Sequence, residues 1–141
     1  MKFLKPKFWD KKQISFFSIL LFPITLFIKL PNFFKRIFTK NYSCSISVIC
    51  VGNIYLGGTG KTPLCIELYS MLKSLNRNPV FIRKKYESFQ DEINLLKRIG
   101  PTYEGSKRIH AINDAIQNKA DVAILDDGFQ DFSINKNLSI V

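Results

Sequence analysis

Alternating apolar and amphipathic segments fill the sequence after residue 45. Runs rich in β-branched and apolar residues predict strands at 46–51, 79–83 and 122–125, with a short extended stretch at 102–104. Segments with apolar residues every three or four positions predict helices at 64–75, 91–99 and 107–119. Strands that alternate with helices are typical of a mostly parallel sheet with helices on both faces. We therefore expect an α/β fold.

The start of the chain has a different pattern, an apolar run bordered by cations. Residues 14–28 carry no charge, and Lys11, Lys12 and Lys29 flank them. The run is shorter than the roughly 20 residues of a spanning helix, and Pro23 lies in its middle. On a helical wheel most polar and basic side chains of the segment share one side, which favours a helix lying in the membrane surface. A signal peptide and a buried core helix remain the alternatives.

The positive charge of the chain is concentrated in this leader. Residues 1–41 hold nine Lys and Arg against one acid, a net of +8, whereas residues 42–141 hold twelve against ten, a net of +2. The leader also contains nine of the thirteen Phe residues, and cations mixed with Phe suit an anionic membrane better than a nucleic acid. We therefore expect a membrane-associated helical leader at 1–41, a folded domain at 42–141, and no nucleic-acid partner.

A glycine-rich loop follows the first predicted strand. Its glycines and the polar pair that ends it are Gly52, Gly57, Gly58, Gly60, Lys61 and Thr62. A strand, a glycine loop and a helix in this order are typical of a nucleotide site, where backbone N–H groups surround phosphate oxygens. The lysine then contacts the β- and γ-phosphates, and the threonine hydroxyl binds Mg²⁺. The usual spacing has a glycine where this chain has Tyr55, so a variant phosphate loop and a chance match both stay open.

Two acids, Asp126 and Asp127, follow the strand predicted at 122–125. The carboxyl ends of parallel strands meet at one edge of a sheet, so we expect these acids beside the glycine loop. Carboxylate oxygens are ligands that Mg²⁺ prefers, although acids after an apolar run are also common in solvated turns. The sequence thus favours a P-loop-like domain that binds a nucleotide and Mg²⁺.

These motifs together resemble the tetraacyldisaccharide 4′-kinase family, enzymes of lipid A and lipopolysaccharide synthesis. The resemblance is carried by Pro6, Phe8 and Trp9, by the glycine block at 51–63 with its displaced first glycine, and by Leu-Asp-Asp-Gly-Phe-Gln-Asp at 125–131. It implies an ATP-dependent kinase that phosphorylates the 4′-hydroxyl of a tetraacyldisaccharide 1-phosphate, giving lipid IVA. It also implies a location on the cytoplasmic face of a Gram-negative-type inner membrane, with a lipid substrate and no evident protein partner.

The resemblance also implies a role for each motif residue. ATP is expected to bind Gly57, Gly58, Thr59, Gly60, Lys61 and Thr62. Mg²⁺ is expected to bind Thr62, Asp126, Asp127 and Gln130. The catalytic residues are then Lys61, which contacts the transferred phosphate, and Asp91, which accepts the proton of the sugar hydroxyl. An acid that stabilises the start of a helix is the alternative interpretation of Asp91.

The sequence departs from the family pattern at three points. Arg83, Lys84 and Lys85 lie where the family has Arg-Gly-Tyr, and they favour a solvated loop over a phosphate-binding one. Asp131 replaces a family histidine, and the chain ends at Val141 inside an apolar run. We expect an N-terminal part of such a kinase, inactive alone. Two other functions stay open: another P-loop small-molecule kinase or nucleotide hydrolase, and a nucleotide-binding membrane adaptor without activity.

Overall fold

The computed structural model describes residues 41–52, 60–85 and 90–141, together with some positions between 22 and 39. The chain divides into two units, Met1–Thr39 and Lys40–Val141. Most of the predicted leader helix lies outside the described residues, as do Pro6, Phe8 and Trp9. Among the described positions, no helix has both the length and the hydropathy that crossing a membrane requires.

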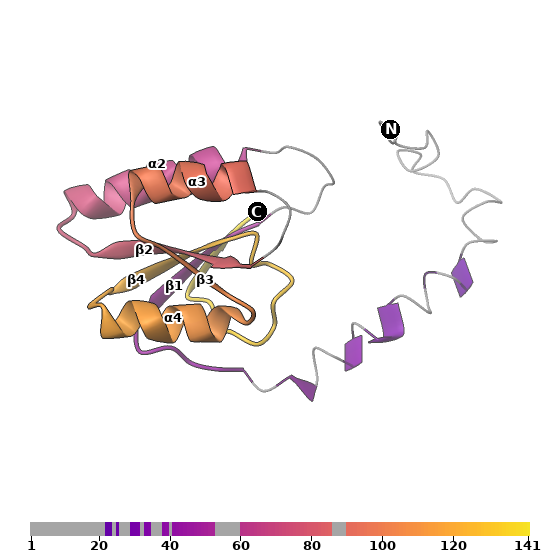
Figure 1. Ribbon diagram of the computed structural model, residues 1–141. Helices are drawn as coiled ribbons and strands as arrows, with labels where there is room; N and C mark the ends of the chain where they lie inside the picture. Colours follow the sequence, from indigo (N-terminus) through magenta and orange to yellow (C-terminus); the bar gives the residue numbers. More distant parts are fainter. Residues whose placement is uncertain are drawn as a thin grey trace. The chain divides into compact units, whose positions relative to one another are not determined.

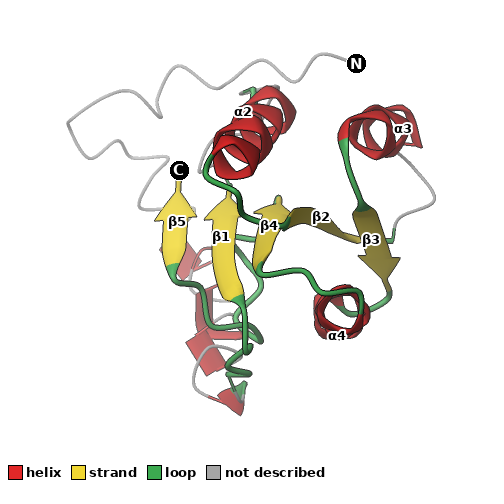
Figure 2. Cartoon of the chain, turned by 90° about the vertical axis from the view of Figure 1, so that its left-hand side faces the viewer, coloured by secondary structure: helices red, strands yellow, loops and turns green. Residues whose placement is uncertain are grey.

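The second unit contains a five-stranded parallel sheet with helices on both faces. Its strands are β1 (Ser47–Val51), β2 (Pro79–Lys84), β3 (Thr102–Gly105), β4 (Val122–Asp126) and β5 (Leu138–Ile140), and its helices are α2 (Lys61–Ser74), α3 (Gln90–Ile99) and α4 (Arg108–Gln117). The strand order is β3-β2-β4-β1-β5. Helices α2 and α3 cover one face of the sheet and α4 covers the other (Figures 1 and 2). The predicted α/β fold with a mostly parallel sheet is thereby confirmed.

The core follows from strands that are apolar on both faces. Strand β4 is buried along its whole length, as expected for a central strand of a parallel sheet. On one face, Cys65 and Tyr69 of α2 pack against Phe81 and Ile124, and the rings of Tyr69 and Phe81 stack with centroids 4.9 Å apart. On the other face, small residues of α4 let the helix approach the sheet closely, namely Ala111 and Ala115.

The register of the sheet brings the ends of β1 and β4 together. Val51 pairs with Asp126, so the carboxyl ends of these two strands lie side by side. Strand β2 pairs with the other side of β4, with Ile82 opposite Leu125. The carboxyl ends of β1, β2 and β4 therefore lie at one edge of the sheet.

Candidate active site

Lys61 begins helix α2 and points toward the loop after β4. Gly60, the preceding residue, has a positive φ of 74°, a conformation that glycine adopts without steric cost. The Lys61 ammonium donates a hydrogen bond from Nζ to Oδ1 of Asp127 over 3.1 Å, and the two groups form an ion pair. Thr62 is half-buried in the same helical turn. The structure therefore joins the lysine and the acidic turn, which are 66 positions apart. Gly57, Gly58 and Thr59 lie outside the described residues.

Asp126 is buried at the end of β4, with only 1% of its surface exposed. Nε of Arg83 lies 3.3 Å from its Oδ2, which is close enough for an ion pair. The alignment does not make a hydrogen bond, and neither carboxylate oxygen accepts one from the described residues. Burial raises the pKa of Asp126, and the Arg83 charge lowers it in part. A buried carboxylate without hydrogen bonds is costly, so the site suits a further positive or hydrogen-donating partner.

The two residues after Asp126 turn the chain sharply. Asp127 has a φ of 56°, and its N–H donates to the Val51 carbonyl over 3.0 Å. Phe129 then passes so close to Gly52 that a Cβ on this glycine would lie 2.5 Å from the Phe129 Cβ. Gly52 is therefore required by a close approach of the two loops. The exposed Gln130 lies in this same turn.

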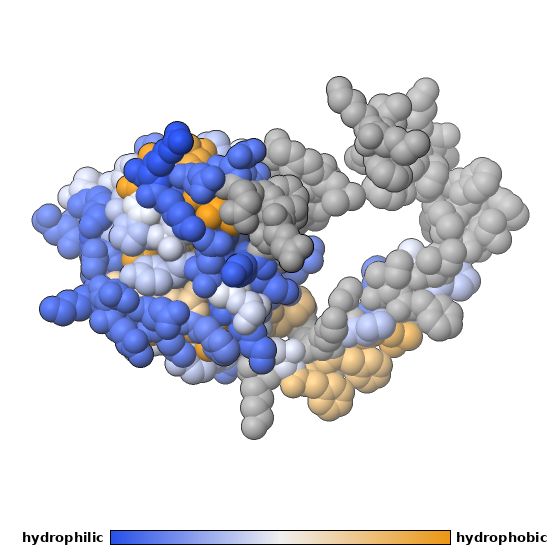
Figure 3. All heavy atoms as spheres, viewed as in Figure 1, coloured by the Kyte–Doolittle hydropathy of each residue, from blue (hydrophilic) through white to orange (hydrophobic). Residues whose placement is uncertain are grey.

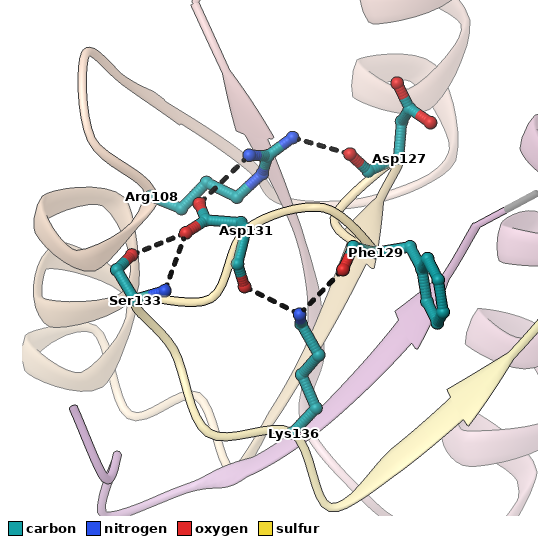
Figure 4. A network of polar contacts seen from close by, with 6 residues as sticks. All are labelled: Arg108, Asp127, Phe129, Asp131, Ser133 and Lys136. Atoms are coloured by element: carbon teal, nitrogen blue, oxygen red, sulfur yellow. Dashed lines mark hydrogen bonds and ion pairs between the residues drawn. The ribbon is translucent and has the colours of Figure 1, made fainter. Parts of the chain in front are cut away.

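A buried arginine stabilises the turn that follows β4 through hydrogen bonds to Asp127 and Asp131 (Figure 4). Arg108, the first residue of α4, is 6% exposed and donates from Nη2 to the Asp127 carbonyl, 2.8 Å away. Its Nη1 lies 3.1 Å from Oδ2 of Asp131. The N–H and hydroxyl of Ser133 donate to the other Asp131 oxygen, over 3.1 and 2.5 Å. The Lys136 ammonium donates to the carbonyls of Phe129 and Asp131. Hydrogen bonds from Arg108 and from Lys136 therefore both stabilise this loop.

The structure gives Asp131 a role that the sequence left open. Burial raises the pKa of this carboxyl group, but hydrogen bonds from Ser133 and Arg108 outweigh the burial and leave the pKa below its usual value. The ionised carboxylate therefore stabilises the folded loop. That contribution is present above the pKa of the unfolded chain and is lost as the pH falls through the folded value.

Replacing Asp131 by Asn should lower the free energy of unfolding by about 1–3 kcal/mol at neutral pH, because the buried Arg108 and the half-buried Ser133 lose a charged acceptor. The difference from the unsubstituted protein should shrink as the pH falls below the ordinary carboxyl pKa. Urea unfolding at neutral and acidic pH measures both effects. Asp114→Asn, an exposed change on α4, is the control and should have little effect. A pH-independent deficit would contradict the assigned charge.

Asp91 lies in the first turn of α3 and is exposed. The next residue, Glu92, connects this turn to the strand ends, because its Oε2 lies 2.5 Å from Nη2 of Arg83. Arg83 in turn contacts Asp126. The structure thus links the helix that carries Asp91 to the acidic pair through two intermediate side chains.

The interpretation of Arg83 as part of a solvated loop is wrong. Arg83 is the fifth residue of β2, and its residue surface is 8% exposed. Two carboxylates from later elements form ion pairs with its guanidinium, and these pairs offset the free-energy cost of burying the charge. Lys84 ends the strand and is exposed, and Lys85 follows it.

Sequence reasoning missed three polar residues that organise this region, namely Arg108, Ser133 and Lys136. Their partners are backbone carbonyls and the Asp131 carboxylate. No sequence motif indicates such partners, because a backbone carbonyl is present at every residue. The one available signal was Asp131, whose type departs from the expected histidine.

The chain is similar in sequence to known proteins of one family. The family model described as "Tetraacyldisaccharide-1-P 4'-kinase" matches residues 17–141. A tetraacyldisaccharide 4′-kinase of Pelagibacter ubique is 46% identical over the whole chain, which covers 45% of that relative. The corresponding protein of Rickettsia bellii is 32% identical over the whole chain and 48% of its own length. No solved structure matches the chain.

The chain spans just under half the length of these curated relatives. The similarity nevertheless extends over the strands, the helix after the glycine loop and the acidic turn, since it covers the whole chain in both relatives. The chain belongs to the tetraacyldisaccharide-1-phosphate 4′-kinase family.

Proposed function

We propose that the chain forms the nucleotide-binding part of an ATP-dependent kinase that phosphorylates the 4′-hydroxyl of a tetraacyldisaccharide 1-phosphate, giving lipid IVA. One observation carries the proposal beyond family membership. The lysine that starts α2 pairs with the acid that follows β4, at the edge where two adjacent parallel strands end. This edge is where α/β proteins of this type bind nucleotides.

The proposed ATP-binding residues are those of the glycine loop, and they act on the phosphates. Backbone N–H groups of Gly57, Gly58, Thr59 and Gly60 would surround the phosphate oxygens, and the N-terminus of α2 adds its partial positive charge. Lys61 would exchange Asp127 for the β- and γ-phosphates. Because phosphoryl transfer depends mainly on positioning and charge stabilisation, this lysine counts as catalytic.

The acidic turn has the donor set of a magnesium site. Thr62, Asp126, Asp127 and Gln130 supply only oxygen ligands, the kind that Mg²⁺ prefers. The buried oxygens of Asp126 fit this assignment, because they accept no hydrogen bond from the described residues and a metal ion would add a second positive charge beside that of Arg83. When bound, Mg²⁺ neutralises negative charge on the phosphate oxygens. The carboxylates would orient it, and the Arg108 clamp would keep the turn in shape.

Asp91 is the proposed acceptor of the proton from the sugar hydroxyl. Asp91 is exposed, so a substrate can approach it. Its helical turn is connected to Asp126 through Glu92 and Arg83. A carboxylate within hydrogen-bond reach of a hydroxyl can accept its proton as the oxygen attacks the phosphoryl group.

The leader is proposed to hold the protein at the cytoplasmic face of the inner membrane. Several of its described side chains are large, apolar and exposed, and orange spheres mark such residues in Figure 3. They are Phe22, Leu30, Phe33, Phe34 and Phe38. Exposed aromatic residues beside cations suit the interface of an anionic bilayer, where the acylated substrate also resides.

Vesicle binding tests the leader. Binding to anionic vesicles should weaken as salt rises, because each surface-near cation contributes about 1 kcal/mol of screened attraction. Replacing both Phe33 and Phe34 by Ser should weaken binding at all salt concentrations, whereas Leu75→Ser, an exposed apolar position of the second unit, should not. Equal binding of neutral and anionic vesicles, or retention that salt does not alter, would contradict the interfacial anchor.

The acceptor test separates this function from that of a soluble small-molecule kinase. The intact protein is incubated with ATP labelled in its γ-phosphate and either the tetraacyldisaccharide 1-phosphate or the same disaccharide phosphate without acyl chains. We expect label in the acylated acceptor and little in the other. Preferential labelling of the soluble acceptor, or release of phosphate without labelling of either, would overturn the proposal.

A further inference from the structure

Arg83 lies between two carboxylates that come from different elements of the fold. Its Nε is 3.3 Å from Asp126 at the end of β4, and its Nη2 is 2.5 Å from Glu92 in the first turn of α3. The Arg83 side chain is 10% exposed and that of Asp126 is 1% exposed. The outer partner, Glu92, is 47% exposed. The three charges form a bridge from the interior of the sheet to the helix surface.

The alternation of side chains along the strands explains why this bridge forms. Phe81 and Ile124 face the core beneath α2, so the residues two positions further, Arg83 and Asp126, point to the same face of the sheet. Helix α3 covers this face as well (Figure 2). Beyond the last apolar layer, the guanidinium therefore meets a carboxylate from the neighbouring strand and another from the helix above.

The bridge fixes the part of α3 that matters for chemistry. Ile93 and Leu96 bury the middle of the helix, with 1% and 0% exposure. The first turn, which contains Asp91, is connected to the strand ends through Glu92 and Arg83. A planar guanidinium holds its donors in a fixed geometry, so it orients two carboxylates more rigidly than the freely rotating ammonium of a lysine does.

We propose that Arg83 is a positioning residue that sets the Asp126 carboxylate and the Asp91 turn relative to each other. The inference rests on the proposed function, since it assigns Asp126 to the metal side and Asp91 to the acceptor side of one reaction. Arg83 contacts neither ATP nor the acceptor in this assignment. It acts by holding two groups whose separation decides whether the hydroxyl and the phosphate meet.

A double-mutant cycle on the intact protein tests this role. Arg83→Gln and Glu92→Gln should each lower kcat, the former by roughly 10- to 100-fold, as expected for misplaced reacting groups. The KM for ATP should change much less than kcat. The double variant should be no slower than Arg83→Gln alone, because both changes break the same bridge. Arg77→Gln, which breaks an exposed ion pair with Asp121, is the matched control and should leave kcat unchanged.

Hydrogen exchange supplies a readout that needs no activity. Arg83→Gln should speed amide exchange in α3 and leave α4 unaltered. If Arg83→Gln fails to fold, Glu92→Gln decides, because it changes an exposed group and keeps the buried pair. Unchanged kcat and unchanged exchange in Glu92→Gln would overturn the inference. An unsubstituted protein without transfer activity would contradict the proposed function instead, and exchange would still decide whether the bridge positions α3.

Discussion

Replacing Lys61 by Ala should lower kcat/KM of the intact kinase by roughly 10²–10³-fold or more, the cost of removing a preorganised donor to developing negative charge. The lysine lies at the start of α2, where a helix N-terminus and backbone N–H groups already favour phosphate. Steady-state transfer to the lipid acceptor measures the loss.

The fold should survive this substitution, because the Lys61 side chain is 24% exposed and pairs with a group that is 60% exposed. Thermal unfolding checks this point. The matched control is Lys73→Ala in the last turn of the same helix, whose ammonium bonds to Asn78 and should be dispensable for transfer. Undiminished turnover in the Lys61→Ala protein would contradict the assignment of the α2 N-terminus to the phosphate site.

Replacing Asp91 by Ala should lower kcat roughly 10²–10⁴-fold, the range expected when a general base is removed. The affinity for ATP should stay nearly constant, because the proposed role concerns the acceptor hydroxyl. Asp91 is exposed, so the folded state should be retained. Single-turnover kinetics and equilibrium nucleotide binding, measured on the same preparation, separate the two quantities.

Asp114→Ala provides the control for Asp91, since it removes an exposed acid from another helix of the same unit. A fall in ATP affinity with an unaltered rate of transfer would move Asp91 from the acceptor to the nucleotide. Loss of stability alone would favour the interpretation of Asp91 as a helix-stabilising acid.

Much of the fold could be predicted because the strands carry their own signal. Val122–Asp126 is buried on both faces, so it appears in the sequence as a continuous apolar run that ends in an acid. Helix α3 shows apolar residues on one side, and its observed bounds differ from 91–99 by one residue. The edge strand β5 was less evident, because it has three residues and Ser139 interrupts its apolar character. Its pairing with β1 depends on tertiary contacts that no local pattern encodes.

The site was predictable where chemistry depends on spacing along the chain. The acids after β4 were expected beside the glycine loop, and Asp127 lies 3.1 Å from Lys61, the second residue after Thr59 at the end of that loop. Arg83 and Arg108 were not assigned to the site, because burial of each arginine depends on partners from distant segments. In the sequence, the three adjacent cations Arg83, Lys84 and Lys85 suggest a solvated loop. In the folded sheet, however, the Asp126 carboxylate lies beside Arg83. Such networks require the folded arrangement and cannot be inferred from residue type.

The most direct test of the central claim is the structure of the intact protein with a non-hydrolysable ATP analogue and Mg²⁺. The account predicts the triphosphate at the N-terminus of α2, with Lys61 moved from Asp127 to the phosphates. It also predicts the metal ion beside Asp126 and Asp127, at the edge where β1 and β4 end. A nucleotide bound elsewhere, or one bound with the Lys61–Asp127 pair intact and no metal at the acidic turn, would contradict it.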